Sequence, residues 1–329
     1  MIECGPEAEA VTRGLGFDCH DVAPVVSVRP PWELAHWTMP LLEVLVIAGA
    51  VFALVHAIRR RRAGDPINLA LWWASLVYLF VIEPPLYFPE WFGLDEIYGF
   101  IFAHNQFTVQ FMWDRLPLYI VAFYPMISQL AYEVVRTLGI FAHRGAVAGS
   151  VAVAFVCQVF YEVFDHIGPQ LRWWAWNPAN AMVNQPMVGL VPLKSALLFA
   201  SVSLGALAYL VVRLPSRWRW AAGALAPLSM VVAGFPASLF GTNVTGQAWA
   251  LWIELALIWV VGAWLVVTAQ RLPDVSAFAR WYPACYLALM AVFWVTAEGV
   301  PVASLVYALV CFAGALLVLA RLYRVRVLV

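Results

Sequence analysis

Nine runs of about 20 mostly apolar residues constrain this 329-residue chain more than any other feature. A helix needs roughly that length to cross the hydrocarbon core of a bilayer, because each residue adds only about 1.5 Å along the helix axis. The sequence therefore predicts an all-α, polytopic integral membrane bundle of about nine transmembrane helices. The predicted spans are Trp37–Ile58, Ile67–Glu83, Leu116–Arg136, Ala146–Phe164, Met187–Val212, Trp220–Phe240, Ala248–Ala269, Tyr282–Ala297 and Pro301–Ala320.

The remaining segments divide the chain into a tail, one membrane domain and a short end. We expect residues 1–36 to form an acidic extracytoplasmic tail, 37–320 a single transmembrane domain, and 321–329 a basic cytoplasmic tail. Residues 97–113 are apolar but interrupted by polar side chains, which predicts an interfacial or re-entrant segment, with a tenth span as the alternative. Residues 165–186 form a Trp-rich outer loop.

Composition excludes several classes of protein. Hydrophobic residues make up 64% of the chain and charged residues only 12%, about half of what a soluble domain carries. The 19 basic and 19 acidic side chains balance, so no positive field attracts a nucleic acid. We therefore expect a cell-membrane protein, of bacterial cytoplasmic-membrane type, with membrane lipids as its surroundings and no nucleic-acid partner.

The arginines predict the orientation of the bundle. Most of them fall in alternate loops and at the C-terminal end, which nine spans bring to one side of the membrane, while the acidic tail lies on the other. The positive-inside rule then places the N-terminus outside and the C-terminus in the cytoplasm. Those arginine groups are Arg59–Arg62, Arg136 and Arg144, Arg213 to Arg219, Arg271 and Arg280, and Arg321 to Arg326.

The cysteines predict no metal or redox motif, since no CxxC spacing occurs. Cys157, Cys285 and Cys311 fall within predicted spans and are expected to be small core residues. Cys4 and Cys19 fall in the outer tail, where oxidation is permitted. Both the disulfide and the free thiols are open alternatives.

Ionisable residues inside the predicted spans concentrate toward the outer side. Each costs about 2.5–3.5 kcal/mol on insertion scales and so needs a reason. Glu43, Lys194 and Glu254 are expected about two turns inside, and Glu83 at the outer end of its span. They predict a polar, substrate-binding chamber that opens outward. The alternatives are interface residues near water and a structural ion pair such as Lys194–Glu254.

The segment Phe160–Asn177 is rich in ionisable and aromatic side chains. Glu162 and His166 are four residues apart and share one helix face, with Asp165 beside them. We predict these three as catalytic. The residues after Gly168-Pro169, which ends the helix, are predicted to wall an apolar pocket, or else to form an interfacial aromatic belt. They are Trp173, Trp174, Trp176 and Asn177.

A second polar stretch precedes the third span. His104 is a predicted catalytic residue, and Asn105 a predicted substrate-binding one. Asp114 is expected to cap the helix that follows, and Arg115 to face an anion at the outer interface. Because Glu162, Asp165, His166 and His104 include only two histidines, they are a poor set for iron or zinc, and we expect no metal and no cofactor.

One local resemblance concerns the order Glu162, Gly168, Trp174, Trp176, Pro186, Gly189 and Val191-Pro192. It is similar to a signature of membrane carotenoid hydratases, enzymes that add water to an isoprenoid double bond by acid chemistry. The resemblance spans about 30 residues, with unequal gaps and aromatic substitutions. No residue role is carried over from it.

Three functions are compatible with these features. The favoured prediction is an intramembrane lyase, hydratase or isomerase acting on a lipophilic isoprenoid, sterol-like or lipid substrate, with Glu162 or Asp165 as acid and His166 or His104 as base. The second is a transporter or lipid-handling protein using buried acids and Lys194. The third is a non-catalytic subunit with a partner in a larger membrane complex.

Overall fold

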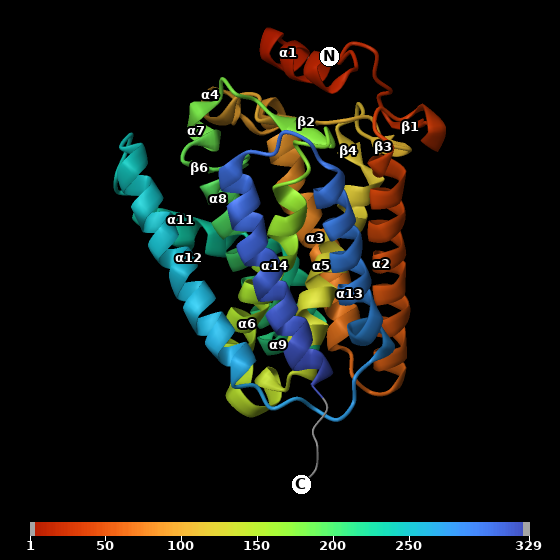
Figure 1. The fold of residues 1–329 in the computed structure, drawn as a ribbon, viewed down its shortest axis with the longest axis vertical. Coiled ribbons are helices and arrows are strands. Elements are labelled where there is room, and N and C mark those ends of the chain that lie inside the picture. Colours follow the sequence, from red (N-terminus) through yellow and green to blue (C-terminus); the bar gives the residue numbers. More distant parts are fainter. Residues whose placement is uncertain (1–3, 325–329) are drawn as a thin grey trace.

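The computed structural model describes residues 4–324, which form an elongated helical bundle with a small folded cap at one end (Figure 1). Within these residues, nine helical segments are long and apolar enough to cross a membrane, which confirms the predicted helical bundle. They are α2 (Thr38–Arg62), α3 (Ile67–Tyr87), α5 (Leu118–Thr137), α6 (Ile140–Asp165), the segment Leu193–Arg213, the segment Ser216–Ser238, α12 (Val244–Val267), α13 (Ala277–Thr296) and α14 (Val302–Tyr323).

Two of the nine segments are interrupted. Leu193–Arg213 consists of α8 (Leu193–Leu197), a wider π-helical turn (Leu198–Val202) and α9 (Ser203–Arg213). Ser216–Ser238 consists of a 3-10 turn (Ser216–Ala221), α10 (Ala222–Leu225) and α11 (Leu228–Ser238), and Pro227 separates the last two. A proline has no N–H to continue the hydrogen-bond ladder.

The cap contains short elements that the prediction of an all-α protein missed. Three small antiparallel sheets have the strand orders β1-β3-β4, β2-β5 and β6-β7. The helices of the cap are α1 (Pro6–Leu15), α4 (Asp95–Tyr98) and α7 (Ala181–Asn184), with 3-10 turns at Pro31–Glu33 and Pro89–Phe92. The strands are β1 (Val26–Val28), β2 (Phe102–His104), β3 (Val109–Phe111), β4 (Leu116–Pro117), β5 (Trp174–Trp176), β6 (Met187–Val188) and β7 (Val191–Pro192).

The core of the bundle is built around α5 and α6. In α5, 89% of the most apolar 18-residue stretch is buried, against 22% in Ser216–Ser238. Helix α5 packs against α2, α3 and α6, and α6 packs in turn against α9, α12 and α14. The peripheral helices therefore present apolar side chains outward, as lipid-facing helices do.

Several helix ends differ from the predicted boundaries for local reasons. Helix α3 continues one turn beyond Glu83, through Pro84-Pro85, so Glu83 is not its last residue. The fifth span begins at Leu193 because residues 187–192 form the β6-β7 hairpin. Lys194 consequently lies in the first turn of its helix rather than two turns inside.

Residues 97–113 form the end of α4 and the strands β2 and β3, rather than a tenth apolar helix. Strand β2 pairs with β5, so that His104 is opposite Trp174 and Phe102 is opposite Trp176. Two predicted segments that are far apart in sequence, 97–113 and the Trp-rich loop, thereby form one roof over the helices.

The N-terminal tail is folded onto this roof. Helix α1 contacts β2 and β5, and β1 pairs with β3. Cys4 and Cys19 form a disulfide that closes the loop carrying α1. The predicted capping role of Asp114 is wrong: its carboxylate lies 2.6 Å from the Arg29 guanidinium, and α5 begins after Pro117 without a side-chain cap.

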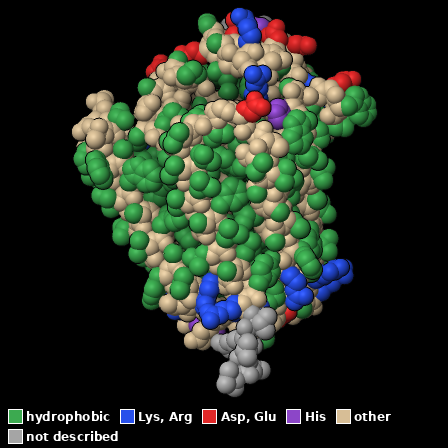
Figure 2. Space-filling view, viewed as in Figure 1, with side chains coloured by type: hydrophobic (Ala, Val, Ile, Leu, Met, Phe, Trp, Pro, Cys, Tyr) green, Lys and Arg blue, Asp and Glu red, His purple; other side chains and the backbone are tan. Residues whose placement is uncertain are grey.

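Charged side chains mark the two ends of the bundle (Figure 2). On the face shown, apolar side chains cover the helices. Acidic groups, with a few basic ones, lie at the end covered by residues 4–36, here called the tail end, and arginines gather at the opposite end, here called the arginine end. Helix α14 ends at Tyr323, so most of the predicted basic tail lies outside the described residues.

Opening the Cys4–Cys19 disulfide is expected to loosen α1 without disturbing the bundle. The 15-residue separation corresponds to about 3 kcal/mol of loop-closure stabilisation. Trypsin cleavage at the exposed Arg13 should be at least tenfold faster in the Cys4→Ser, Cys19→Ser double variant. The exposed free thiol of Cys285 provides the control Cys285→Ser; equal cleavage of both variants would show that the disulfide does not hold the tail.

Candidate functional site

A cavity of about 410 Å³ lies beneath the roof, between α3, α5 and α6 on one side and α8 and α11 on the other. This volume falls within the range of small-molecule sites. Its lining is mainly apolar and aromatic, with few polar side chains. The lining residues are Glu83, Leu86, Tyr98, Ile101, Phe102, His104, Ile120, Phe123, Tyr124, Tyr161, Phe164, Asp165, Trp174, Trp176, Met182, Val183, Pro192, Lys194, Ser195, Leu198, Phe199, Met230 and Val231.

Two carboxyl groups line the cavity, and their surroundings differ. Glu83 accepts a hydrogen bond from the Tyr124 hydroxyl of α5. Asp165 ends α6 and is 6% exposed, and its Oδ2 has no hydrogen-bond partner among residues 4–324. A buried carboxyl normally has partners, because burying an unsatisfied polar group is costly. Of the two carboxyl groups in this cavity, Asp165 is therefore the one that lacks a partner in the part of the chain described.

His104 lies in the cavity wall at the end of β2. Its Nδ1 is 3.0 Å from the Tyr119 hydroxyl, so one ring nitrogen is held and the other is left for a second partner. Burial lowers the pKa of His104 to about 3. The imidazole is then neutral at physiological pH, and one of its two nitrogens can accept a hydrogen bond.

Aromatic rings from three elements form a continuous wall. Phe123 stacks on Phe164 with centroids 4.6 Å apart and meets Tyr161 edge-on at 4.9 Å. Trp174 lies 5.0 Å from Phe164. These ring faces carry negative potential, which attracts positive charge. Trp174 and Trp176, two of the residues predicted to wall a pocket, line this cavity.

The mouth of the cavity lies on the side of the bundle. Met182 of α7 and Val231 of α11 line the cavity yet are 56% and 72% exposed. Lys194 is also at this wall, where its Nζ donates to the Met182 carbonyl at 2.8 Å. An ammonium has three donors, so that single bond leaves capacity for a ligand.

Glu162 and His166 share a helix face as predicted, but that face is turned away from the cavity. His166 Nε2 is 3.1 Å from Glu162 Oε2, and its Nδ1 is 3.2 Å from Ser304 Oγ of α14. Both side chains are completely buried. Asp165 and Glu162 are three residues apart, yet only Asp165 lines the cavity.

Five other predicted binding residues hold the cap together. Trp173 donates to Thr38 at 2.8 Å and is fully buried. The others bond to segments of the tail or loops rather than lining the cavity: Asn105 donates to the Leu15 and Arg172 carbonyls, Asn177 to Glu7 and Phe100, and Arg115 to the Tyr87 carbonyl, while Glu43 accepts from Thr108.

Glu254 does not line the cavity. It lies on α12 and is partly buried. The ion pair considered for Lys194 and Glu254 does not form, since Lys194 bonds to a backbone carbonyl instead. The start of α8 at Leu193, later than predicted, places Lys194 at the roof.

Several cavity residues escaped the sequence analysis. Tyr161, Phe123 and Phe164 have no charge to draw attention, although Tyr161 lies four residues before Asp165 and hence on its helix face. Phe199 lies in the π-helical turn that lines the cavity. Such turns are frequent at functional sites and have no reliable sequence signal.

Groups with metal-binding side chains are sparse in the part of the chain described. There, one cluster combines three suitable groups, Cys4, Cys19 and His20. Its two sulfurs are joined in the disulfide. The four residues considered as a metal set are divided. Asp165 and His104 line the cavity, whereas Glu162 and His166 lie together on the other side of α6.

Comparison of the chain with protein-family models, curated protein sequences and solved structures finds no match.

Proposed function

We propose that this chain is an integral membrane enzyme that acts on a lipophilic substrate, of isoprenoid, sterol-like or lipid type, by general acid–base chemistry. The observation that carries the proposal is the Asp165 carboxyl, buried in an aromatic cavity with an oxygen that lacks a partner. The lateral mouth supports entry of an apolar ligand from the bilayer. The arginine end is then cytoplasmic and the cavity lies toward the outer leaflet.

Asp165 is the proton donor in this proposal. An ionised carboxylate without a partner is strongly disfavoured away from water, so a carboxyl in such a site tends to stay neutral and can donate a proton. Positive charge that develops on the ligand would face the rings of Phe123, Phe164 and Trp174. Glu83, already bound to Tyr124, provides a second carboxyl in the same space.

The placement of the four predicted catalytic residues supports a division of roles. Asp165 and His104 line the same cavity, so the neutral His104 ring can position a ligand group or water near the acid. Glu162 and His166 lie 3.1 Å apart on the side of α6 that faces away from the cavity. We therefore assign the chemistry to Asp165 and His104.

The lateral mouth also supports a lipid-handling function, in which a ligand enters the cavity and leaves unchanged. Passage through the whole bundle would need a polar path to the arginine end. Glu133, a fully buried acid toward that end, is instead bound by Arg136 and Asn68. Lipid binding within one leaflet is thus the second candidate.

Asp165→Asn is expected to lower turnover at least 100-fold, the usual contribution of a positioned acid or base. Purified protein in liposomes would be incubated with a lipid extract rich in polyisoprenoids and sterols, and the extract analysed by mass spectrometry for a species consumed and a species formed. Asparagine keeps the shape of the side chain but cannot supply the acidic proton.

Glu162→Gln is the matched control, because it removes another buried carboxyl, three residues away, that does not line the cavity. Its turnover should stay within about threefold of wild type. Unchanged turnover in Asp165→Asn would overturn the assignment of the acid. A lipid that co-purifies unaltered with both variants and with wild type would favour lipid handling.

A further inference from the structure

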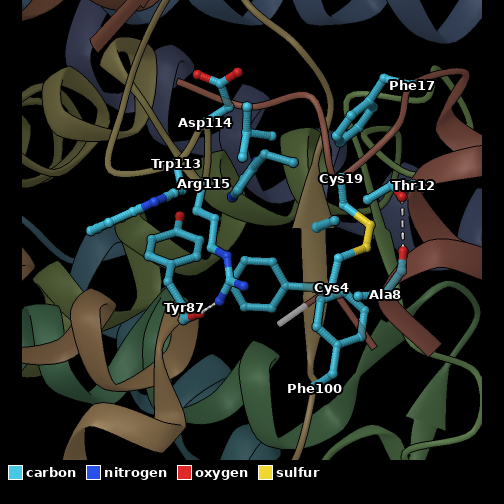
Figure 3. A pocket seen from close by; sticks show the side chains of 14 residues that line it. Cys4, Ala8, Thr12, Phe17, Cys19, Tyr87, Phe100, Trp113, Asp114 and Arg115 are labelled. Atoms are coloured by element: carbon cyan, nitrogen blue, oxygen red, sulfur yellow. Dashed lines mark hydrogen bonds between the residues drawn. A yellow bond between two sulfur atoms is a disulfide. The ribbon is translucent and has the colours of Figure 1, made fainter. Parts of the chain in front are cut away.

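A second, smaller cavity lies on the other side of strand β2, beneath the disulfide-closed tail (Figure 3). Its volume is about 50 Å³, and a cavity of only about 10–15 Å³ can hold one water molecule. Its walls come from the tail, with Ala8 and Thr12, from the end of α3, with Tyr87, and from the turn between β3 and β4, with Arg115.

The two cavities share part of their lining. Phe102 and His104 of β2 line both the small cavity and the large one. The strand is therefore a partition one residue thick between a pocket at the tail end and the aromatic site. A group bound in the small cavity would reach His104 from the side opposite to the lipid mouth.

Polar groups line the small cavity, and one of them lacks a partner within the described part of the chain. The Tyr87 hydroxyl is buried without a hydrogen-bond partner among residues 4–324, and Tyr87 as a whole is 5% exposed. The ring centroids of Tyr87 and His104 are 5.7 Å apart, and His104 bonds to Tyr119 through Nδ1 alone. Two groups that already have one bond add to them (Figure 3). The Thr12 hydroxyl donates to the Ala8 carbonyl at 2.9 Å and can still accept, and the Arg115 guanidinium donates to the Tyr87 carbonyl and has further N–H groups.

Water matches this set of groups better than an ion or an organic ligand. A buried water needs two to four polar partners, and here the hydroxyls of Tyr87 and Thr12, the imidazole and the guanidinium provide them. The nearest carboxylate, Asp114, is already held by Arg29 at 2.6 Å. The space is too small for a substrate.

We propose that the small cavity is a water-binding site that links the aqueous tail end to His104 and, through it, to the large cavity. This inference rests on the proposed acid–base function. An acid in a site that opens to lipid exchanges its proton with water only if water reaches it by another route. The tail, closed by the Cys4–Cys19 disulfide, forms the outer wall of that route.

Hydroxyl-radical footprinting tests this proposal without any substrate, because it oxidises side chains that adjoin bound water even when they are buried. In the full-length protein, Tyr87 should be oxidised at least tenfold faster than Tyr132, which is also 5% exposed but lies far from the cavity. The exposed Tyr98 serves as the reference for full reactivity.

Ala8→Phe should fill the cavity and lower Tyr87 oxidation at least fivefold, with Tyr98 unchanged. Thr12→Val, which keeps the shape of the side chain, should give a smaller decrease and covers the case in which Ala8→Phe displaces α1. Tyr87 oxidised as slowly as Tyr132 would overturn the water site. Fast oxidation that neither variant lowers would overturn the small cavity as its source. Neither outcome changes how the turnover of Asp165→Asn is interpreted, so the two proposals are tested separately.

Discussion

Replacing Glu133 with alanine is expected to destabilise the bundle by about 3–5 kcal/mol, the usual cost of leaving a buried charge without its partner. Glu133 is fully buried in α5 near the arginine end. Its carboxylate accepts from Arg136 at 2.6 and 2.8 Å and from Asn68 of α3 at 3.2 Å, and it lies 3.1 Å from His56 of α2. The carboxylate thus joins three helices.

The measurement is unfolding of the purified protein in mixed micelles, followed by circular dichroism. Glu133→Gln should lose less than Glu133→Ala, because the amide oxygen still accepts hydrogen bonds. Glu96→Ala, at an exposed position of α4, is the control for loss of an acid at a site without such contacts. Equal midpoints for Glu133→Ala and Glu96→Ala would mean that the network adds nothing to stability.

Gly168→Ala is expected to disrupt the aromatic wall of the candidate site. A Cβ at this position would overlap the Trp174 indole, which packs on Phe164 and pairs across the roof with His104. The indole has to move, at a cost of about 1–3 kcal/mol for overpacking, and the cavity loses one wall. If the cavity holds a lipid as proposed, the lipid should then be retained at least tenfold less on native mass spectrometry.

Gly14→Ala is the control for this substitution, because a Cβ at Gly14 meets open space. It lies in α1, within a helix, where alanine is favoured over glycine. Thermal unfolding and lipid retention should match wild type in Gly14→Ala and fall in Gly168→Ala. If Gly168→Ala retains lipid as wild type does, Trp174 is not a necessary wall of the site.

Some features of the fold can be predicted from short stretches of the sequence. Long apolar runs predict the spans, since only helices of about 20 residues satisfy their own backbone across a bilayer. Glycine sets one boundary sharply: Gly145 has φ of 81°, and the regular part of α6 begins after it, where the apolar run begins. Glu162 and His166 meet because a spacing of four places them on one face.

The site could be predicted only in part, because helix phase and long-range pairing depend on the other helices. Asp165 and Glu162 lie on the same helix turn, and only the packing of α5 and α14 against α6 determines which of them lines the cavity. Lys194 lies less deep in its helix than predicted, because the β6-β7 hairpin occupies the residues before it and α8 begins only at Leu193.

The sequence by itself determined that this chain forms apolar helices, about how many, and that most of its arginines gather at one end of them, because these properties follow from residue type and spacing. Tertiary structure alone decided that the tail folds onto the roof, that β2 pairs with β5, and that Asp165 shares a cavity with Glu83 and His104. Those contacts join segments up to 170 residues apart in sequence, and no local pattern encodes which pairing buries the most surface.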